Sequence, residues 1–484
     1  MTETSARTRA ASTGTGEARP APRSRVLTIV PPVVIALLMV ALSRYAGDGI
    51  SDPDALWHIR AGDVLRQRWQ FAGDDPLGTF THGRWILNQW LGELLMSVTH
   101  SWGGLPAVAW LTTVGRIGVC LAVYAACVRR AGSLPAAVVT AATVVGVAGG
   151  LSPRPQLVAF VLLAVTVSGW LATATDLRPR WWLVGTAWLW ACCHGTWVVG
   201  VMVGLATVGG LVLERRLDLR GAVKLALLPM LSVVVATLTP LGPALFSGFA
   251  AVRAVSPYIQ EWQHPSPTSP STLAVAALAT STLLLWWRQR ELRSWSRLAL
   301  WLLGVGWAAL YARTVPVGAI ILAPLAAEAV SHVLGRPAGA SRWQNRVVGL
   351  GAALALAVGA AAAAAGPHGP VGVPERLSPA LDALPVGSVV WNDDALGGWL
   401  IYSHPSLRQT ADTRAELYGV AAARSYLMVI AARPGWEAQF DRLHPQAVLV
   451  GQGAPLVDGL ERRGGWHEVG RDGGFVLLEA VSPP

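Results

Sequence analysis

Long apolar runs restrict the fold of this chain more than any other feature of its sequence. They recur at about 17 to 25 residues, the length that an α-helix needs to cross the hydrocarbon core of a bilayer. The composition agrees, because 53% of the 484 residues are hydrophobic and only 14% are charged. The sequence therefore predicts a polytopic α-helical membrane protein with about eleven transmembrane helices. We expect the spans at residues 26–46, 105–128, 134–150, 155–175, 181–194, 196–213, 222–239, 271–287, 297–312, 314–333 and 346–366.

Loop charge predicts how these helices are oriented. Basic residues cluster in the short loops at one end of the expected spans, as at Arg129-Arg130 and from Arg288 to Arg297. Such loops face the cytoplasm under the positive-inside rule, and an odd number of spans puts the two chain ends on opposite sides. We therefore expect a protein of the cytoplasmic membrane, with its amino end inside and its carboxy end outside.

The overall charge and the cysteines exclude some classes of function. The net charge of +10 follows from the basic loops, so it does not indicate a nucleic-acid partner. The four cysteines all fall inside apolar runs, and no disulfide framework is predicted. The sequence contains no P-loop, HExxH or GxSxG, which leaves nucleotide cradling, zinc-protease and serine-hydrolase chemistry without support.

The composition divides the chain into three regions. Residues 1–25 are rich in Ser, Thr, Ala and Arg, which predicts a disordered cytoplasmic tail. Residues 26–366 hold the membrane domain, including a large first extracytoplasmic loop at 47–104. Residues 367–484 have the mixed pattern of a small soluble α/β domain outside the membrane. Within it we expect strands at 388–391, 447–450 and 475–478, and helices at 415–432 and 455–463.

The first outer loop is too polar and too aromatic to be a simple tether. Residues 52–93 contain five Asp, two His and four Trp. Asp52 and Asp54 flank Pro53, a spacing that suits sharing one cation or one hydroxyl group. The same three residues also begin an ordinary helix, with Asp52 as N-cap, Pro53 at the first position and Asp54 favoured by the dipole. Both interpretations stay open.

Further along this loop, the spacing of Asp54 and His58 puts them on one helix face. The same helix, with its several Trp and Leu residues, is also compatible with an amphipathic helix that lies in the membrane interface without chemistry. Asp74-Asp75 before Pro76 is typical of a turn. Glu93 is expected to face solvent.

Other unusual polar residues collect on the outer face of the predicted topology. Arg116 is an exception inside the second span, where an Arg is expensive unless it faces protein or water. It marks either a functional site or an internal ion pair. In the soluble domain, Asp412 followed by Arg414 is typical of an internal salt bridge. The remaining outer-face candidates are Arg154, His194, Glu261, Trp262 and Arg313.

These residues resemble a family of bacterial polytopic membrane proteins related to the GT-C glycosyltransferase superfamily. The resemblance begins in the first outer loop and covers nearly the whole chain after residue 45. The positions that depart from the family pattern are Ala55-Leu56, Gln89 and Cys192-Cys193. The segments that carry the resemblance are Asp52 to Ile59 with Gly62, Asp75-Pro76, Trp85 to Glu93, Arg154 to Gln156, Trp190 to Gly200, Pro240 to Gly242, Glu261-Trp262, Arg313, and Asp412 to Arg414 with Tyr418.

The resemblance implies an enzyme that moves a sugar from a polyprenyl-phosphate donor to an extracytoplasmic glycan or protein acceptor. An acidic residue of the first outer loop would serve as base or metal ligand. We expect Asp54, with Asp52 and His58, to carry the chemistry, and Mg²⁺ or Mn²⁺ between the two Asp is compatible but not required. The donor's lipid tail would lie in the membrane. The residues expected to bind substrates are Arg116, Arg154, His194, Glu261, Trp262, Arg313, Asp412 and Arg414.

Two other functions use the same sequence features. A transporter or flippase of a lipid-linked substrate would place ionisable residues at the midplane and show inverted repeats. Arg116 is the one such residue, and no internal repeat is evident. A non-catalytic membrane scaffold would use the Trp-rich loop to dock a partner and would not need Asp54.

Overall fold

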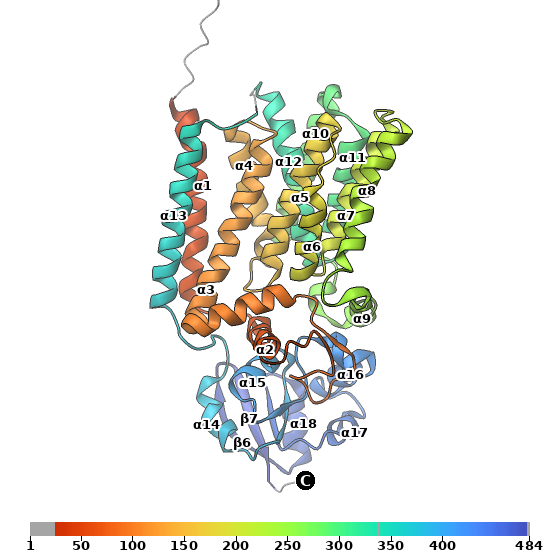
Figure 1. The fold of residues 1–484 in the computed structure, drawn as a ribbon. Coiled ribbons are helices and arrows are strands. Elements are labelled where there is room, and N and C mark those ends of the chain that lie inside the picture. The colour runs from red at the N-terminus through yellow and green to blue at the C-terminus, as the bar shows by residue number, and fades with distance from the viewer. Residues whose placement is uncertain (1–24, 336–337, 482–484) are drawn as a thin grey trace, which may run out of the picture.

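The protein consists of a helical bundle with a smaller domain attached to one of its ends (Figure 1). The computed structural model describes residues 25–335 and 338–481. The expected tail therefore lies, apart from Arg25, outside the described residues. The start of α1 and the last described residues lie at opposite ends of the molecule (Figure 1), as the topology prediction requires.

Each expected span coincides with a helix of the bundle. Among the described residues, eight helices are long and apolar enough to cross a membrane, while α6, α7 and α11 are shorter apolar helices. The chain is an integral membrane protein on this evidence, and the exact number of spans stays a prediction. The bundle helices are α1 (Arg25–Arg44), α3 (Trp90–Val128), α4 (Ser133–Val147), α5 (Gln156–Asp176), α6 (Trp182–Cys193), α7 (Trp197–Leu213), α8 (Leu219–Ala236), α10 (Pro270–Arg288), α11 (Trp295–Leu310), α12 (Val315–Val333) and α13 (Arg342–Ala365).

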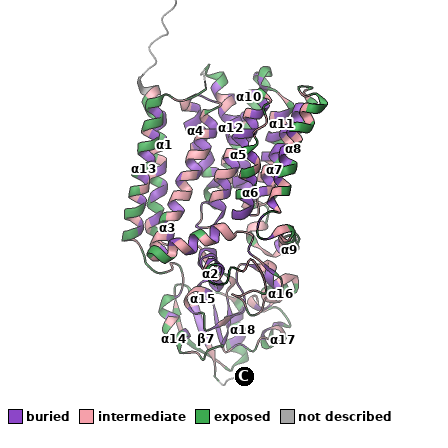
Figure 2. Cartoon of the chain, viewed as in Figure 1, coloured by how far each residue is buried: buried purple, intermediate pink, exposed green. Residues whose placement is uncertain are grey.

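Small residues let the central helices approach closely. Helix α12 is the most enclosed of the eight long apolar helices, and 89% of its most apolar stretch is buried inside the protein. At Gly318, an added Cβ would lie 2.4 Å from the carbonyl oxygen of Gly304 in α11. Association of helices in a membrane depends on such close packing, because lipid offers no hydrophobic drive. The outer helices show the opposite pattern, and many residues of α13 are exposed (Figure 2).

Helix α3 has two parts, an arm that runs across the end of the bundle and a longer part that enters it (Figure 1). The backbone leaves the helical region at Gly103 and Gly104. Gly104 has a φ of 62°, which favours glycine, and Pro106 then starts the inserted part. This bend coincides with the expected end of the first outer loop at residue 104, whose boundary with the membrane stays a prediction.

Helix α2 (Pro53–Arg68) lies between the α3 arm and the soluble domain. Its apolar residues Leu56, Ile59 and Leu65 are buried against protein. Much of the apolar side of this helix therefore packs on protein, although Trp69 at its end is 63% exposed.

The soluble domain is built on one mixed sheet. The strand order is β4-β3-β5-β7-β6, with β4, β3 and β5 parallel and the other two pairings antiparallel. The three predicted strands are present as β3, β5 and β7. The sequence missed β4, which is only two residues long, and β6, whose side chains are mostly exposed. The elements are β3 (Val389–Asn392), β4 (Arg408–Gln409), β5 (Ala447–Gly451), β6 (Trp466–Asp472), β7 (Phe475–Ala480), α14 (Ser378–Ala383), α15 (Asp394–Ser403), α16 (Ala415–Ile430), α17 (Trp436–Asp441) and α18 (Pro455–Arg463).

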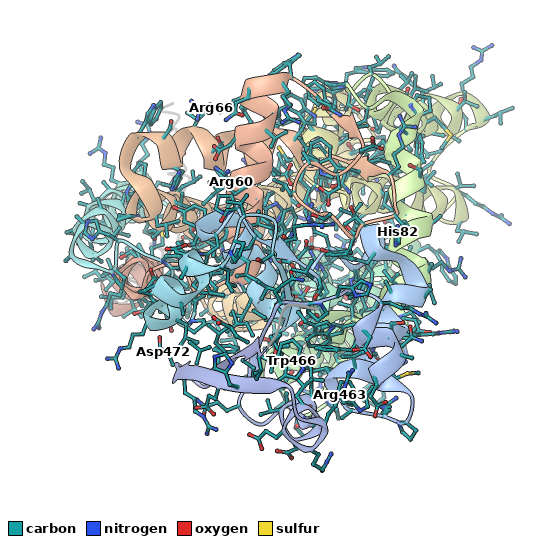
Figure 3. The ribbon with its side chains drawn as sticks, turned by 90° about the horizontal axis from the view of Figure 1, so that it is seen from below. Arg60, Arg66, His82, Arg463, Trp466 and Asp472 are labelled. Carbon is teal, nitrogen blue, oxygen red and sulfur yellow. The ribbon has the colours of Figure 1, made fainter. Side chains whose placement is uncertain are left out.

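The seam between the two domains is a close one. At Gly398 of α15, an added Cβ would lie 2.1 Å from the carbonyl oxygen of Pro53 in α2. In the loop between β1 (Ala72–Gly73) and β2 (Trp85–Ile86), the His82 amide donates to the carbonyl of Leu417 in α16 at 2.8 Å. Viewed from the soluble-domain end, His82 lies beside that domain (Figure 3). The first outer loop is thus an integral part of the interface.

The fold gives a direct test of orientation. We expect a reporter fused after Pro484 to be active only outside the cytoplasm, because the basic loops at the opposite end of the bundle face inward. Alkaline phosphatase and a cytoplasm-dependent fluorescent protein, fused in parallel, provide the measurement and its control. A fluorescent carboxy-terminal fusion without phosphatase activity would contradict this orientation.

Candidate functional site

The first turn of α2 places two carboxylates at the seam. Asp52 is the N-cap and its Oδ1 accepts a hydrogen bond from the Asp54 amide at 2.9 Å, with Pro53 at the first helical position. The helix-start interpretation is therefore confirmed. Capping uses only one oxygen of Asp52, so the other oxygen and the whole Asp54 carboxylate remain available for further contacts.

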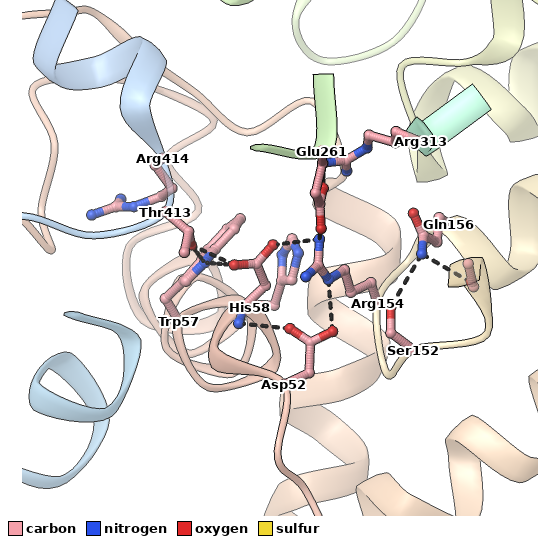
Figure 4. A network of polar contacts seen from close by, with 12 residues as sticks. Asp52, Trp57, His58, Ser152, Arg154, Gln156, Glu261, Arg313, Thr413 and Arg414 are labelled. Atoms are coloured by element: carbon pink, nitrogen blue, oxygen red, sulfur yellow. Dashed lines mark hydrogen bonds and ion pairs between the residues drawn. The ribbon is translucent and has the colours of Figure 1, made fainter. Parts of the chain in front are cut away.

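A single guanidinium group joins these carboxylates to a third one. Arg154 comes from the bend between η2 (Ala148–Gly150) and α5. Its Nε lies 2.7 Å from Asp52 Oδ2, and its Nη1 lies 2.8 Å from Asp54 Oδ2 and 3.0 Å from Glu261 Oε1. Figure 4 shows Arg154 between Asp52 and Glu261. Segments far apart in the sequence therefore meet on one side chain.

Glu261 and Arg313 form the open side of this group. Glu261 lies in η5 (Gln260–Trp262), and its other oxygen, Oε2, is 2.6 Å from Nη1 of Arg313 in η7 (Ala312–Thr314). The Glu261 side chain is 42% exposed, against 10% for Asp54. The Arg313 guanidinium also lies over the Trp262 ring, 5.9 Å from its centroid. We call Asp52, Asp54, Arg154, Glu261 and Arg313 the Arg154 cluster.

The soluble domain completes the surroundings of Asp54. Thr413, which follows β4, donates its hydroxyl to Asp54 Oδ1, and the Trp57 indole donates to the same oxygen at 3.3 Å. The sequence analysis listed Asp412 and Arg414 as candidate site residues, but it gave no role to Thr413 between them. Its position in the motif Asp412-Thr413-Arg414 was the only available signal.

The charges around Asp54 hold it ionised. Burial raises the pKa of a carboxyl group, but the neighbouring Arg154, His58 and the Thr413 hydroxyl together outweigh burial and hold the pKa of Asp54 below its ordinary value. In the same way, the pKa of Arg154 is raised despite its burial, because Asp54 and Asp52 stabilise the charged form. The resting site thus contains a carboxylate and guanidinium pair.

His58 lies on the side of α2 that packs against the α3 arm. Its Nδ1 lies 2.9 Å from Glu93 Oε1, and each side chain is only 2% exposed. The expectation that Glu93 faces solvent is therefore wrong. The reason is a close helix crossing, since an added Cβ at Gly62 of α2 would lie 2.2 Å from the Glu93 carbonyl oxygen. Helical spacing alone does not reveal that crossing.

Asp412 and Arg414 form a separate, fully enclosed brace. Arg414 reaches Asp412 Oδ2 through Nη2 at 2.7 Å and Asp75 Oδ1 through Nη1 at 2.9 Å. Tyr418 donates its hydroxyl to Asp412 at 2.8 Å. The predicted salt bridge within the motif is confirmed. Asp75 also accepts from the Leu77 amide, as expected of a turn, but its pairing with Arg414 was not predicted.

Arg116 and His194 are the two remaining candidates. Arg116 donates through Nε to the carbonyl oxygen of Leu151 at 2.8 Å, and its guanidinium lies over the Tyr45 ring. These contacts within the described residues do not include the internal ion pair that was one of the two alternatives for Arg116. His194 is buried, and its Nδ1 lies 2.8 Å from the Thr196 hydroxyl. Arg116 and His194 as substrate-binding residues stay a prediction.

The arrangement does not fit a divalent cation held between Asp52 and Asp54. Asp52 Oδ2 and Asp54 Oδ2 both contact the Arg154 guanidinium. Within the described ranges, no set of three His, Cys, Asp or Glu side chains is grouped so as to hold a metal ion. A guanidinium group occupies the position that a shared cation would need.

Comparison with known proteins gives a fold but no close relative. No family model matches the chain, and no curated protein is similar to it in sequence. Among solved structures, the archaeal oligosaccharyltransferase AglB from Archaeoglobus fulgidus, in complex with an inhibitory peptide and a dolichol-phosphate, aligns with a TM-score of 0.58 at 12% identity. That alignment covers 87% of this chain and 69% of AglB.

A second solved structure matches over almost its whole length. ArnT from Cupriavidus metallidurans, bound to undecaprenyl phosphate, aligns with a TM-score of 0.54 at 14% identity, covering 94% of this chain and 98% of ArnT. The protein therefore shares the fold of these two solved structures, which is the GT-C-like arrangement that the resemblance implied. A crystal structure of the Archaeoglobus fulgidus oligosaccharyltransferase in complex with Zn and sulfate aligns with a TM-score of 0.55 at 13% identity, covering 87% of this chain and 68% of that one.

The Arg414 brace leads to a prediction about stability. Asp412→Ala should lower the yield of folded protein, because it leaves Arg414 buried with one carboxylate partner fewer, at a cost of about 3–5 kcal/mol. Thermal unfolding in detergent measures the loss. The exposed pair Arg463–Asp441 supplies a control, since Asp441→Ala should change stability by less than about 1 kcal/mol. Equal stability of the two variants would contradict the structural role of the brace.

Proposed function

We propose that the protein is a membrane glycosyltransferase that moves a sugar from a polyprenyl-phosphate donor to an acceptor at the seam between its two domains. The observation that carries the proposal is the buried Asp54 carboxylate, contacted by Arg154 on one side and by Thr413 of the soluble domain on the other. The fold supports the same reaction class, since AglB and ArnT were solved with dolichol-phosphate and undecaprenyl phosphate.

Arg154 and Arg313 are the proposed site for the donor phosphate. The two oxygens of Glu261 bridge these guanidinium groups at 3.0 and 2.6 Å. A phosphate group presents oxygens in a comparable way and binds Arg through charge-assisted hydrogen bonds. Because Glu261 is partly exposed and lies in the short 3-10 helix η5, we propose that the donor phosphate takes its place. The lipid tail would extend between the bundle helices into the membrane.

Asp54 is the proposed base. The acceptor hydroxyl oxygen forms a bond to the anomeric carbon of the sugar while the bond from that carbon to the phosphate oxygen breaks. The hydroxyl proton passes to Asp54, and polyprenyl phosphate leaves with the bonding electrons. When the donor phosphate competes for Arg154, Asp54 loses part of its ion pair and becomes a stronger base. Asp52 positions Arg154, and the enclosed His58 supports the helix behind Asp54.

The acceptor is proposed to enter from the soluble-domain side. Thr413 reaches Asp54 from that domain, and the Arg414 brace holds this segment against the first outer loop. An acceptor bound along this edge would bring its hydroxyl to Asp54. A glycan and a protein segment are both suitable acceptors for such a seam. We assign the brace to positioning the acceptor side, while the Arg154 cluster binds the donor.

The proposal predicts unequal effects of two similar substitutions. Asp54→Asn should lower turnover about 10²–10⁴-fold, because it removes the charge of the base while preserving its shape. Asp52→Asn should be milder, since Asn caps a helix nearly as well as Asp. Transfer of sugar by purified protein in detergent provides the measurement, with thermal stability recorded for both variants. Full activity of a folded Asp54→Asn protein would rule out this mechanism and favour a scaffold.

The pKa of Asp54 predicts the pH dependence. The folded, donor-free protein keeps Asp54 charged down to pH values below the ordinary carboxyl pKa of about 3.9. The profile of kcat/KM, which reports the free enzyme, should therefore show no acidic limb from Asp54 between pH 5 and pH 8. The profile of kcat reports the enzyme with donor bound. Its acidic limb should lie at a higher pH than that of kcat/KM, because bound donor weakens the pairing of Asp54 with Arg154. Loss of this limb in Asp54→Asn would identify Asp54 as the titrating group. Acidic limbs at the same pH in both profiles would contradict the proposed replacement of Glu261 by the donor phosphate.

A further inference from the structure

The contacts of Arg154 resemble those of a metal ion more than those of an ordinary ion pair. Three carboxylates from two segments, Asp52 and Asp54 at the start of α2 and Glu261 in η5, contact one cationic group at 2.7 to 3.0 Å. Hard divalent cations select the same kind of oxygen donors. The centre of this set is a guanidinium group, which is always protonated and has donors on several sides.

We infer that Arg154 replaces a divalent cation in this site, so that the resting protein excludes Mg²⁺ and Mn²⁺ from the carboxylates and meets the donor phosphate with guanidinium alone. This inference deepens the proposed function, since it names the group that balances charge there. It concerns the side chains of the chain itself and can be tested without any transfer reaction.

Two features hold Arg154 in this place. Its backbone lies between Pro153 and Pro155, which restrict the φ angle on either side, and its amide donates to the Ser152 carbonyl at 2.8 Å. Its side chain is 13% exposed. A side chain anchored in this way has little freedom to leave the carboxylates.

The remaining oxygens of the set are also engaged. Asp54 Oδ1 accepts from Thr413 and Trp57, and Glu261 Oε2 contacts Arg313. A divalent ion entering the set would lie at contact distance from Arg154 and near Arg313. Like charges repel strongly in a partly buried site, where water screens them poorly. The carboxylates already hold one cationic group in Arg154, so repulsion from Arg154 and Arg313 would keep a divalent ion out of the set.

Binding of Mn²⁺ to the purified full chain, followed by electron paramagnetic resonance, tests the inference. Wild-type protein should show no Mn²⁺ site that depends on Asp54. Arg154→Ala removes the internal cation and should create a site for one Mn²⁺, tighter than any binding to wild type by about tenfold or more, since affinity follows ligand charge. The double variant Arg154→Ala with Glu261→Gln should lose much of that binding.

A matched control removes another paired arginine. Arg297 makes a bidentate contact with Glu328 and lies near the start of α11, whereas the site follows the end of that helix. Arg297→Ala should not acquire Mn²⁺ binding. Arg154→Gln keeps more of the side-chain volume and serves where Arg154→Ala does not fold. Mn²⁺ should raise the unfolding temperature of each Arg154 variant that folds. It should leave the unfolding temperature of the wild-type protein unchanged.

Two results would overturn the inference. One is a Mn²⁺ site in wild type that disappears in Asp54→Asn. The other is a folded Arg154→Ala or Arg154→Gln protein that binds Mn²⁺ no better than wild type. Neither result depends on sugar transfer, so a failure of the proposed function is distinguishable from a failure of this inference.

Discussion

The pairing of Arg154 with three carboxylates is the interaction on which the candidate site depends. Each of these charges loses water at the seam, and such a loss is tolerated only where partners and geometry compensate. The first turn of α2, the bend before α5 and the segment containing Glu261 are therefore tied to one another through one side chain. With Arg313 included, the cluster has three carboxylates and two guanidinium groups. An anionic ligand that replaces Glu261 is the simplest exchange this balance allows.

Close backbone contacts make that charge cluster possible. Gly62 lets α2 cross the α3 arm at Glu93, and Gly398 lets α15 approach the start of α2. A side chain at either position would meet a carbonyl oxygen and force the elements apart. The proximity of Thr413 to Asp54 depends on this packing, because the two residues belong to different domains. Substitutions at these glycines would act on the site without touching it.

Two acidic groups of similar sequence appearance have different roles because their surroundings differ. Asp412 has bonds from Arg414 and Tyr418 within an enclosed interior, which suits a permanent structural contact. Asp54 shares Arg154 with two other carboxylates, one of which is partly exposed. In the first arrangement both oxygens of Asp412 accept hydrogen bonds from Arg414 or Tyr418, and substrate binding by Asp412 and Arg414 stays a prediction. The second includes the partly exposed Glu261, which is the partner that the proposed donor phosphate would replace.

The sequence by itself determined the elements that depend on local pattern. Apolar length located the bundle helices, and Asp52-Pro53-Asp54 was recognisable as a helix start. The apolar strands β3, β5 and β7 were also predictable, whereas β4 was too short and β6 too polar to give a signal.

Only the tertiary structure decided which of these residues meet. The burial of Glu93 against His58, the pairing of Asp75 with Arg414 and the hydroxyl of Thr413 on Asp54 all join segments that are distant in the chain. Sequence periodicity reports which face of one element is apolar, but not which other element covers that face. The central position of Arg154 follows from three such meetings at once. For that reason the sequence indicated the candidate residues, while their charge balance became visible only in the folded chain.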